Sequence, residues 1–344
     1  MVVTINPDQH AAVLRVSAYH RRDFDLSVVC SDPQKHSAVQ PFISEPFPNP
    51  ATAPLGALRH LPNEVLAEIC SYLDVLSSFK LRQVSREARQ VVSASPAYRD
   101  LSKHCLESLR GALRMEIADW LPVADLHRVL CTSECSRCGC FGPLLFLPMI
   151  ERCCYRCLVT EPEFRQVSLS ALSEATKVST SRLRELVPVL HTIPGKYHLF
   201  GPRFTETHDL VAERAILQCP TPLDIQDLPD FIPEPEDEHV VLRCMMATAF
   251  PYLGKASSDI DGGVSCKGCL IAATDKREVS DKTKASELME MSYSREGFLV
   301  HFQSCEEAQK LWQASHGGTV EAAKFPYVRN FEYISADHPE EYYN

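Results

Sequence analysis

The sequence predicts a mostly α-helical chain, α+β overall, with an N-terminal helical module followed by an irregular α+β domain. Three observations support this fold class. Apolar residues recur at helical spacing between residues 58 and 115, strand-like segments are few, and closely spaced cysteine pairs occur among proline-rich connections. The chain has 344 residues, of which 45% are hydrophobic. This length and composition are typical of a globular protein with about two domains.

Residues 1–56 are expected to form a weakly ordered tail. Six prolines lie among polar residues between positions 33 and 54, and such a composition buries little apolar surface. Residues 23–30 could form a strand, although an isolated strand would be only marginally stable.

Helical periodicity begins near residue 58. The apolar residues that share one face of the first predicted helix are Leu61, Val65, Ile69 and Leu73. Pro62 fits the first helical position, and Glu64 complements the helix dipole. A second helix is predicted to start near Ser77, and Ser85 is a suitable N-cap for a third helix that Pro96 ends. The apolar residues that the second helix is expected to bury are Phe79, Leu81 and Val84.

Residues 57–100 resemble the F-box. The matching positions are Leu61, Pro62, Glu64, Leu66, Ile69, Tyr72, Leu73, Leu81, Val84, Ser85 and Arg86. The aromatic residue often found after the Val-Ser-Arg of this family is absent here, where Ala88 and Val91 stand instead. Residues 101–340 resemble, more loosely, the cysteine-rich C-terminal halves of some fungal F-box proteins.

The resemblance implies a protein that is not an enzyme. An F-box docks on a Skp-type adaptor and through it joins a cullin–RING ubiquitin ligase, the SCF (Skp–cullin–F-box) complex. The chain would then be its substrate-recognition subunit, with residues 101–340 binding a target protein. Three short helices cannot bury all their apolar residues against one another, which independently predicts a partner surface. The residues expected to contact the adaptor are Leu61, Pro62, Glu64, Val65, Leu66, Ile69, Leu73, Leu81 and Val84.

Cysteines between residues 135 and 157 have the spacing of a structural zinc site. Cys135 and Cys138 form one C-x2-C pair, and Cys154 and Cys157 form another after an interval of 15 residues. Each pair can place two thiolates on one metal at about 2.3 Å, so the two pairs supply a tetrahedral set.

A second set of metal ligands is predicted further along the chain. Cys266 and Cys269 form a C-x2-C pair, and His301 and Cys305 follow at an i, i+4 separation on one helix face. Alternatively, a helix that begins near Ser304 would place His301 and Cys305 on either side of a helix junction, where they could still converge.

More than one pairing of these ligands is compatible with the sequence. Local pairing closes shorter loops, although the first pair could also combine with Cys266 and Cys269. The cysteines left over in the first region are Cys131, Cys140 and Cys153, of which Cys153 is an alternative to Cys154. Each arrangement gives four protein ligands per metal, so about two structural zinc ions are expected to staple the C-terminal domain.

The remaining segments are less regular. Residues 169–193 and 294–315 have helical periodicity, whereas residues 219–238 contain five prolines and an acidic end and predict a surface loop. Residues 239–250, rich in β-branched and apolar side chains, are the best strand candidate.

Charge and motifs restrict the classes of function. The net charge of −10 and the absence of a Lys/Arg run argue against a nucleic-acid partner. The N-terminus does not resemble a signal peptide, and the most apolar stretch is too short to span a membrane. We therefore expect a soluble cytoplasmic or nuclear protein in a reducing compartment. No phosphate-binding, hydrolase or metalloprotease motif is present, so no catalytic residue is predicted.

Two alternatives remain open at this level. The chain could be a zinc-stabilised protein-interaction module that acts outside the ubiquitin ligase. The cysteine pairs could instead be redox-active, or the zinc could bind nucleic acid. Redox C-x-x-C motifs usually lie at a strand-to-helix junction in a βαβ unit, a setting that the sequence predicts for neither pair.

Overall fold

The computed structural model describes residues 5–31, 36–45, 55–197, 202–220, 236–254, 259–274 and 287–320. The helices are α1 (His10–Ser17), α2 (Arg22–Leu26), α3 (His36–Ile43), α4 (Asn63–Tyr72), α5 (Val75–Val84), α6 (Arg86–Ala94), α7 (Pro96–His104), α8 (Leu106–Arg114), α9 (Val123–Leu130), α10 (Tyr155–Thr160), α11 (Leu169–Thr176), α12 (Thr180–Leu186), α13 (Glu213–Leu217), α14 (Glu236–Cys244), α15 (Lys267–Thr274), α17 (Arg295–Phe302) and α18 (Glu306–Ala314). The strands are β1 (Ala18–Tyr19), β2 (Leu144–Phe146), β3 (Glu151–Cys153), β4 (Gln166–Ser168), β5 (Val189–His191), β6 (Gly195–Lys196), β7 (Arg203–Phe204), β8 (Asp209–Ala212), β9 (Ala247–Ala249), β10 (Tyr252–Leu253), β11 (Ile260–Asp261) and β12 (Ser265–Cys266).

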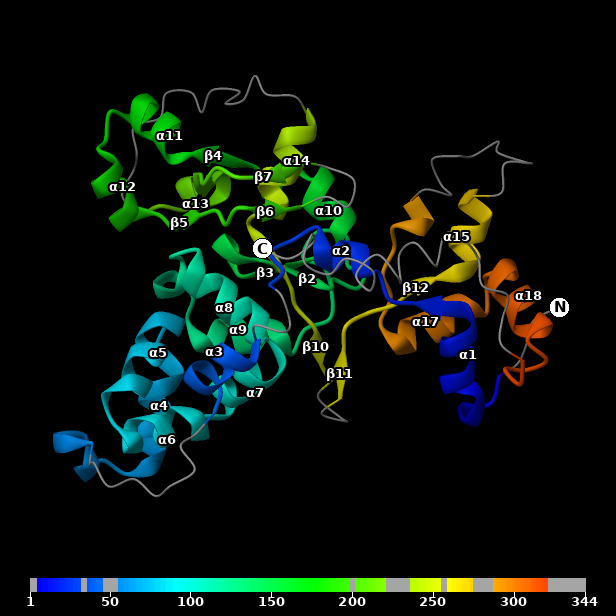
Figure 1. Cartoon of the computed structure of the whole chain (residues 1–344), viewed down its shortest axis with the longest axis horizontal. Helices are drawn as coiled ribbons and strands as arrows, with labels where there is room; N and C mark the ends of the chain where they lie inside the picture. Colours follow the sequence, from blue (N-terminus) through cyan, green and yellow to red (C-terminus); the bar gives the residue numbers. More distant parts are fainter. Residues whose placement is uncertain are drawn as a thin grey trace.

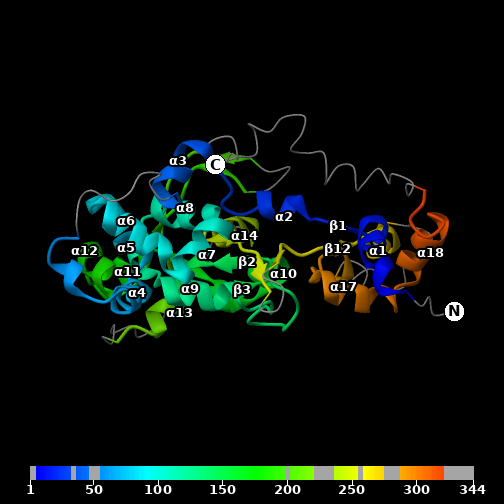
Figure 2. The ribbon, with the colours of Figure 1, turned by 90° about the horizontal axis from the view of Figure 1, so that it is seen from below.

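The elements form a row of packed units. Helices α4–α9 gather at one end, and a helical module of α1, α15, α17 and α18 lies at the other (Figure 1; Figure 2). The sheet β3-β2-β9 lies between these two ends, whereas the sheet β4-β8-β5 packs with α11 on the side of the helical bundle (Figure 1). The mostly helical α+β fold class that the sequence predicts is therefore confirmed, with its N-terminal helical bundle and its strand-containing C-terminal region.

Side-chain caps set the starts of α5 and α6. The Asp74 carboxylate accepts a hydrogen bond from the Ser77 backbone N–H at 2.7 Å, so α5 begins slightly earlier than predicted. The Ser85 hydroxyl accepts from the Ala88 N–H at 3.1 Å, as the sequence predicts for an N-cap. Each such cap stabilises its helix by about 1 kcal/mol. The next helix, α7, begins at Pro96, where the sequence predicts a break.

The buried face of α5 differs from the prediction. Val84 is 75% exposed, whereas Arg82 is fully buried. The Arg82 guanidinium donates to the carbonyl of Glu45 at 2.8 Å, and the Tyr98 hydroxyl donates to the carbonyl of Ile43 at 2.7 Å. Residues 36–45 thus pack on the F-box-like helices, and the expectation of a disordered tail is wrong for this segment.

One hydrophobic core runs across residue 100, where the sequence predicts a domain boundary. It includes Val92 and Tyr98 on one side of that position and Leu101 and Leu109 on the other, and it continues into β2. The central sheet has the order β3-β2-β9, with Leu144 of β2 opposite Cys153 and Ala249. The helical bundle and this sheet are therefore built on the same core.

Two segments differ from the predicted secondary structure. Residues 236–244 form α14 and only Ala247–Ala249 form a strand, because α14 packs on α10 and packing overrides the β preference of its residues. The helix predicted over residues 169–193 is divided. Lys177, with a left-handed φ of 57°, ends α11, and Ser179 caps α12. The chain then enters β5, which lies at the edge of the sheet β4-β8-β5.

The N-terminal residues belong to the far module, so the prediction of a disordered tail is also wrong for residues 5–31. Val13 and Val16 of α1 are buried in one cluster with Phe298 and Trp312. Strand β1 pairs antiparallel with β12, and the dark blue α1 lies beside the orange α17 and α18 (Figure 1; Figure 2). The predicted strand over residues 23–30 is instead α2 followed by a single bridge at Val29.

Parts of two predictions lie outside the described residues. They are residues 32–35 and 46–54 of the predicted tail and residues 221–235 of the predicted loop. In the described part of the chain, no helix has both the length and the apolar character needed to cross a membrane.

Candidate metal centres and docking helix

The first candidate centre consists of Cys135, Cys138, Cys154 and Cys157, whose sulfur atoms all lie within 4.8 Å of one another. A hydrogen bond from the Gly139 N–H to the Cys135 carbonyl, 3.0 Å long, closes the first pair into a tight loop. Gly139 has a φ of 73°, a left-handed conformation that favours glycine. The second pair follows β3, because Cys154 caps α10 and Cys157 lies in its first turn.

Sulfur separations in this centre fit a zinc ion. Cys138 Sγ and Cys154 Sγ are 3.7 Å apart. A tetrahedron with zinc–sulfur bonds of about 2.3 Å has sulfur–sulfur edges of about 3.8 Å. A hydrogen bond from the Cys154 thiol lowers the pKa of Cys135, which favours the thiolate, the form that binds metal.

The second candidate centre consists of Cys266, Cys269, His301 and Cys305, whose ligand atoms also lie within 4.8 Å of one another. Cys266 Sγ is 3.7 Å from Cys305 Sγ, and Cys269 Sγ is 3.3 Å from His301 Nε2. The alternative in which a helix junction separates His301 from Cys305 is the one observed. His301 lies in the last turn of α17, and Cys305 is the N-cap of α18.

Close packing holds the second centre in place. A Cβ atom at Gly268 would lie 2.4 Å from the backbone nitrogen of Ala308, so only glycine lets α15 approach α18 this closely. The Tyr293 ring stacks on the His301 imidazole, with 4.5 Å between their centroids.

Hydrogen bonds from the thiols of Cys266 and Cys269 lower the pKa of Cys305 well below its usual range.

Each centre is formed by local pairing, and the crossed combination of cysteine pairs is not the one observed. Cys153 is fully buried outside the first centre, and Cys154 takes the ligand position. Cys140 lies beside the first centre and remains partly exposed. Burial and the charge of the neighbouring Cys138 raise the pKa of the Cys140 thiol to about 11.

Two of the cysteine pairs lie at strand-to-helix junctions, which the sequence did not predict. Cys154 and Cys157 follow β3 into α10, and Cys266 lies at the end of β12 just before α15. The strands of these junctions pair antiparallel with their neighbours, whereas a βαβ unit has parallel strands. The setting typical of C-x-x-C oxidoreductases is therefore only partly reproduced.

Helix α4 presents an apolar face to solvent. Val65 is 42% exposed, Ile69 is 39% exposed and Tyr72 is 75% exposed, at positions that share one side of the helix. The opposite side of α4 packs on α6 and α9. Tyr72 was not among the residues expected to bind a partner, and its place in the i, i+3 row after Ile69 is the signal that could have identified it.

The other residues expected to contact an adaptor differ in exposure. Leu66 is 6% exposed, so its side chain packs inside the chain and is not available to a partner, contrary to the expectation from the motif. Pro62, Glu64 and Val84 are exposed. The expected contact residues with half-buried side chains are Leu61, Leu73 and Leu81.

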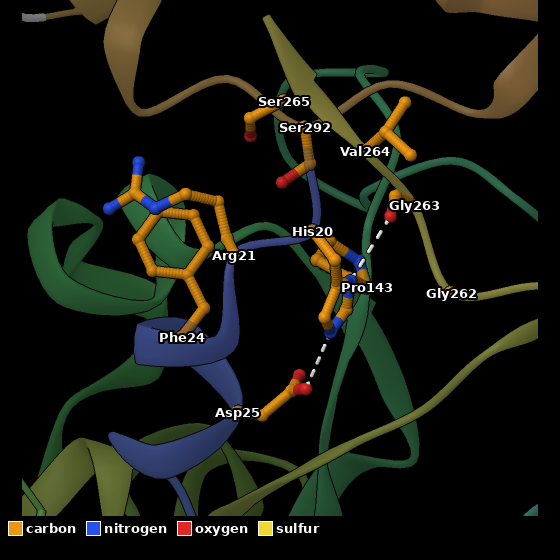
Figure 3. Close-up of a pocket in the computed structure, with 10 residues that line it drawn as sticks. All are labelled: His20, Arg21, Phe24, Asp25, Pro143, Gly262, Gly263, Val264, Ser265 and Ser292. Atoms are coloured by element: carbon orange, nitrogen blue, oxygen red, sulfur yellow. Dashed lines mark hydrogen bonds and ion pairs between the residues drawn. The ribbon is translucent and has the colours of Figure 1, made fainter. Parts of the chain in front are cut away.

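A small pocket that sequence reasoning missed lies at the junction with the far module. His20 lies between Asp25 of α2 and the loop that joins β11 to β12 (Figure 3). Its Nε2 is 2.7 Å from the Asp25 carboxylate and its Nδ1 is 3.3 Å from the Gly263 carbonyl. Both partners only accept hydrogen bonds, which favours the doubly protonated ring, and the Asp25 hydrogen bond raises the pKa of His20.

Comparison with known proteins identifies one domain. The family model of the F-box domain matches residues 58–100, which cover α4–α6 and the first half of α7. No match was found among curated proteins or among solved structures. The chain therefore contains an F-box domain. Domains of this family bind Skp-type adaptors of cullin–RING ubiquitin ligases, and the proteins that carry them are generally adaptor subunits and not catalysts.

Proposed function

We propose that this protein is a substrate-recognition subunit of an SCF-type ubiquitin ligase, which acts in the cytoplasm or nucleus. The F-box domain would dock on a Skp-type adaptor, and the residues that follow it would hold a target protein. The protein would accelerate ubiquitin transfer by raising the effective concentration of its target beside the ligase. No residue of this chain would take part in covalent chemistry.

The exposed side of α4 is the observation that carries this proposal. Val65, Ile69 and Tyr72 form an apolar row on a helix whose other side is already packed. Adjacent apolar residues that are exposed on a short helix are typical of a groove-binding helix in a complex. We propose that this row, together with Pro62 and Leu61, contacts the adaptor.

Both candidate centres are proposed to hold structural zinc. Each offers four protein ligands at separations that suit a tetrahedron, which leaves no position open for substrate. The ion would supply cross-links between segments that share little regular structure. Zinc in the second centre would join the end of β12 to the junction of α17 and α18.

The docking proposal is tested by adaptor binding to the full-length chain. Val65→Glu combined with Ile69→Glu should weaken binding by at least about tenfold, because both side chains would lie in the interface. The two positions are exposed and Glu is a good helix former, so α4 should persist. Val300→Glu is the matched control, since Val300 is 70% exposed on α17 in the far module.

Equal recovery of the adaptor by wild type and the α4 double variant would contradict the docking proposal. Adaptor binding without any cullin in the complex would instead favour an interaction module that works outside the ligase.

The metal proposal is tested by elemental analysis of protein purified under reducing conditions. We expect about two zinc ions per chain, and about one after Cys269→Ser, which removes a single ligand from the second centre. A zinc content near zero in the wild-type protein would contradict this assignment.

A further inference from the structure

We propose that Cys138 and Cys140 form an oxidant-sensitive pair, and that a hydroperoxide opens the first metal centre by joining them in a disulfide. This inference rests on the zinc occupancy proposed above. It concerns a modification site that the F-box function does not require.

Exposure singles out Cys138. All fifteen cysteines lie in described residues, and Cys138 is the one that is exposed. The other three ligands of the first centre, Cys135, Cys154 and Cys157, are buried. Cys138 is therefore the ligand residue of this centre that lies most open to a small oxidant.

A spare thiol lies next to the exposed ligand. Cys140 is partly exposed and is separated from Cys138 by Gly139 alone, whose left-handed backbone turns the chain sharply. The Cys140 carbonyl accepts a hydrogen bond from the Cys135 N–H at 2.6 Å, which folds this residue back against the loop of the first pair. The second centre differs, because no fifth cysteine lies near its ligands in the sequence.

The chemistry balances with a hydroperoxide as the oxidant. The Cys138 thiolate attacks the peroxide, the O–O bond breaks, and Cys138 becomes a sulfenic acid, while the leaving hydroxide or alkoxide takes a proton from solvent and departs as water or an alcohol. The Cys140 sulfur then attacks the sulfenic sulfur, the S–S bond forms, and the hydroxyl group leaves with the Cys140 proton as water. The Cys138 thiolate and the Cys140 thiol lose two electrons in total, and the peroxide gains them. Three ligands remain, so metal affinity falls.

Peptide mapping tests this pair in the full-length protein. Trypsin cleavage after Arg137 and Arg152 yields a fragment, residues 138–152, whose only cysteines are Cys138 and Cys140. Zinc-loaded protein is treated with an equivalent of hydrogen peroxide, alkylated and digested. We expect this fragment to be two hydrogens lighter and to resist alkylation until it is reduced, with release of about one of the two metal ions.

Variants distinguish this inference from general thiol damage. Cys140→Ser keeps all four ligands and should slow metal release about fivefold or more, with Cys138 trapped as a sulfenic acid that reacts with a dione probe. Cys219→Ser is the matched control, since Cys219 is also partly exposed but lies outside both centres, and it should behave as wild type.

Two results would overturn the inference. One is a disulfide between fragment 138–152 and fragment 153–156, which carries Cys153 and Cys154, because the oxidised pair would then not be Cys138 and Cys140. The other is equal metal release by wild type and Cys140→Ser. Untreated protein without metal would overturn the zinc proposal as well, whereas a disulfide between these two fragments in a zinc-loaded protein would overturn only this inference.

Discussion

Buried arginines show how single residues organise this fold. Arg152 is 2% exposed, and its guanidinium donates to the carbonyls of Val129, Gly142, Phe250 and Pro251. These carbonyls come from the end of α9, from the segment before β2 and from the segment that follows β9. Burial lowers the pKa of Arg152 to about 10, and the carbonyl dipoles compensate for the lost hydration.

Replacement of Arg152 by methionine should therefore be severely destabilising. Each buried carbonyl left without a donor costs about 1–3 kcal/mol, so the unfolding free energy should fall by at least about 3 kcal/mol. Urea titration of zinc-loaded protein measures this change. Arg128→Met is the control, because Arg128 is exposed and forms a surface ion pair with Asp125, and its effect should stay within about 0.5 kcal/mol. Equal unfolding midpoints for the two variants would contradict the structural role of Arg152.

At the scale of elements, the contact between α15 and α18 determines the geometry of the second centre. Gly268→Ala would place a methyl group against the Ala308 backbone and force the two helices apart. Because Cys269 lies in α15 and Cys305 caps α18, we expect one of two zinc ions to exchange with a chromophoric chelator at least about tenfold faster.

Gly262→Ala provides the control for this substitution. A Cβ atom there would meet only a His20 ring carbon at 3.9 Å, an ordinary contact. Unchanged zinc exchange in Gly268→Ala, or equally fast exchange in both variants, would show that close approach of α15 to α18 does not control the centre.

The individual elements also show which features of the fold could be predicted from the sequence and which could not. The Ser85 cap depends on residues a few positions apart, so it was predictable from the sequence. The two ligand sets were predictable from the spacing of their cysteines. Helix α1 was not predictable, because Val13 and Val16 pack with residues almost 300 positions away. An eight-residue helix also has little stability of its own. The burial of Leu66 likewise depends on which face of α4 meets its neighbours, which periodicity alone does not determine.

At the scale of the whole molecule, His20 links α2 to the far module. The charged groups nearest to its ring are Asp25 and Arg22, and the Gly263 carbonyl completes its contacts. The pKa of His20 is raised in the folded protein, so its contribution to stability is fully present below pH of about 6.5 and is lost as pH rises through the folded-state pKa.

Hydrogen exchange across this pH range tests the link. With intrinsic rates corrected for pH, amides of residues 260–266 should lose protection in wild type as pH rises above about 6.5. His20→Asn should show low protection at every pH, and His127→Asn, which removes a histidine paired with Asp100 in the bundle, should behave as wild type at this loop. The same pH profile in His20→Asn and wild type would contradict the assignment.

The packing of α1 against α17 and α18 also has a consequence for biosynthesis. The partners of α1 at residues 298–312 leave the ribosome only after almost 300 further residues have been made, which at 5–20 residues per second takes roughly 15–60 s. During that time Val13 and Val16 are unprotected, while the F-box helices, whose contacts are local, can already assemble. Nascent chains that stop before Cys305 would therefore expose the apolar face of α1 to chaperones and proteases.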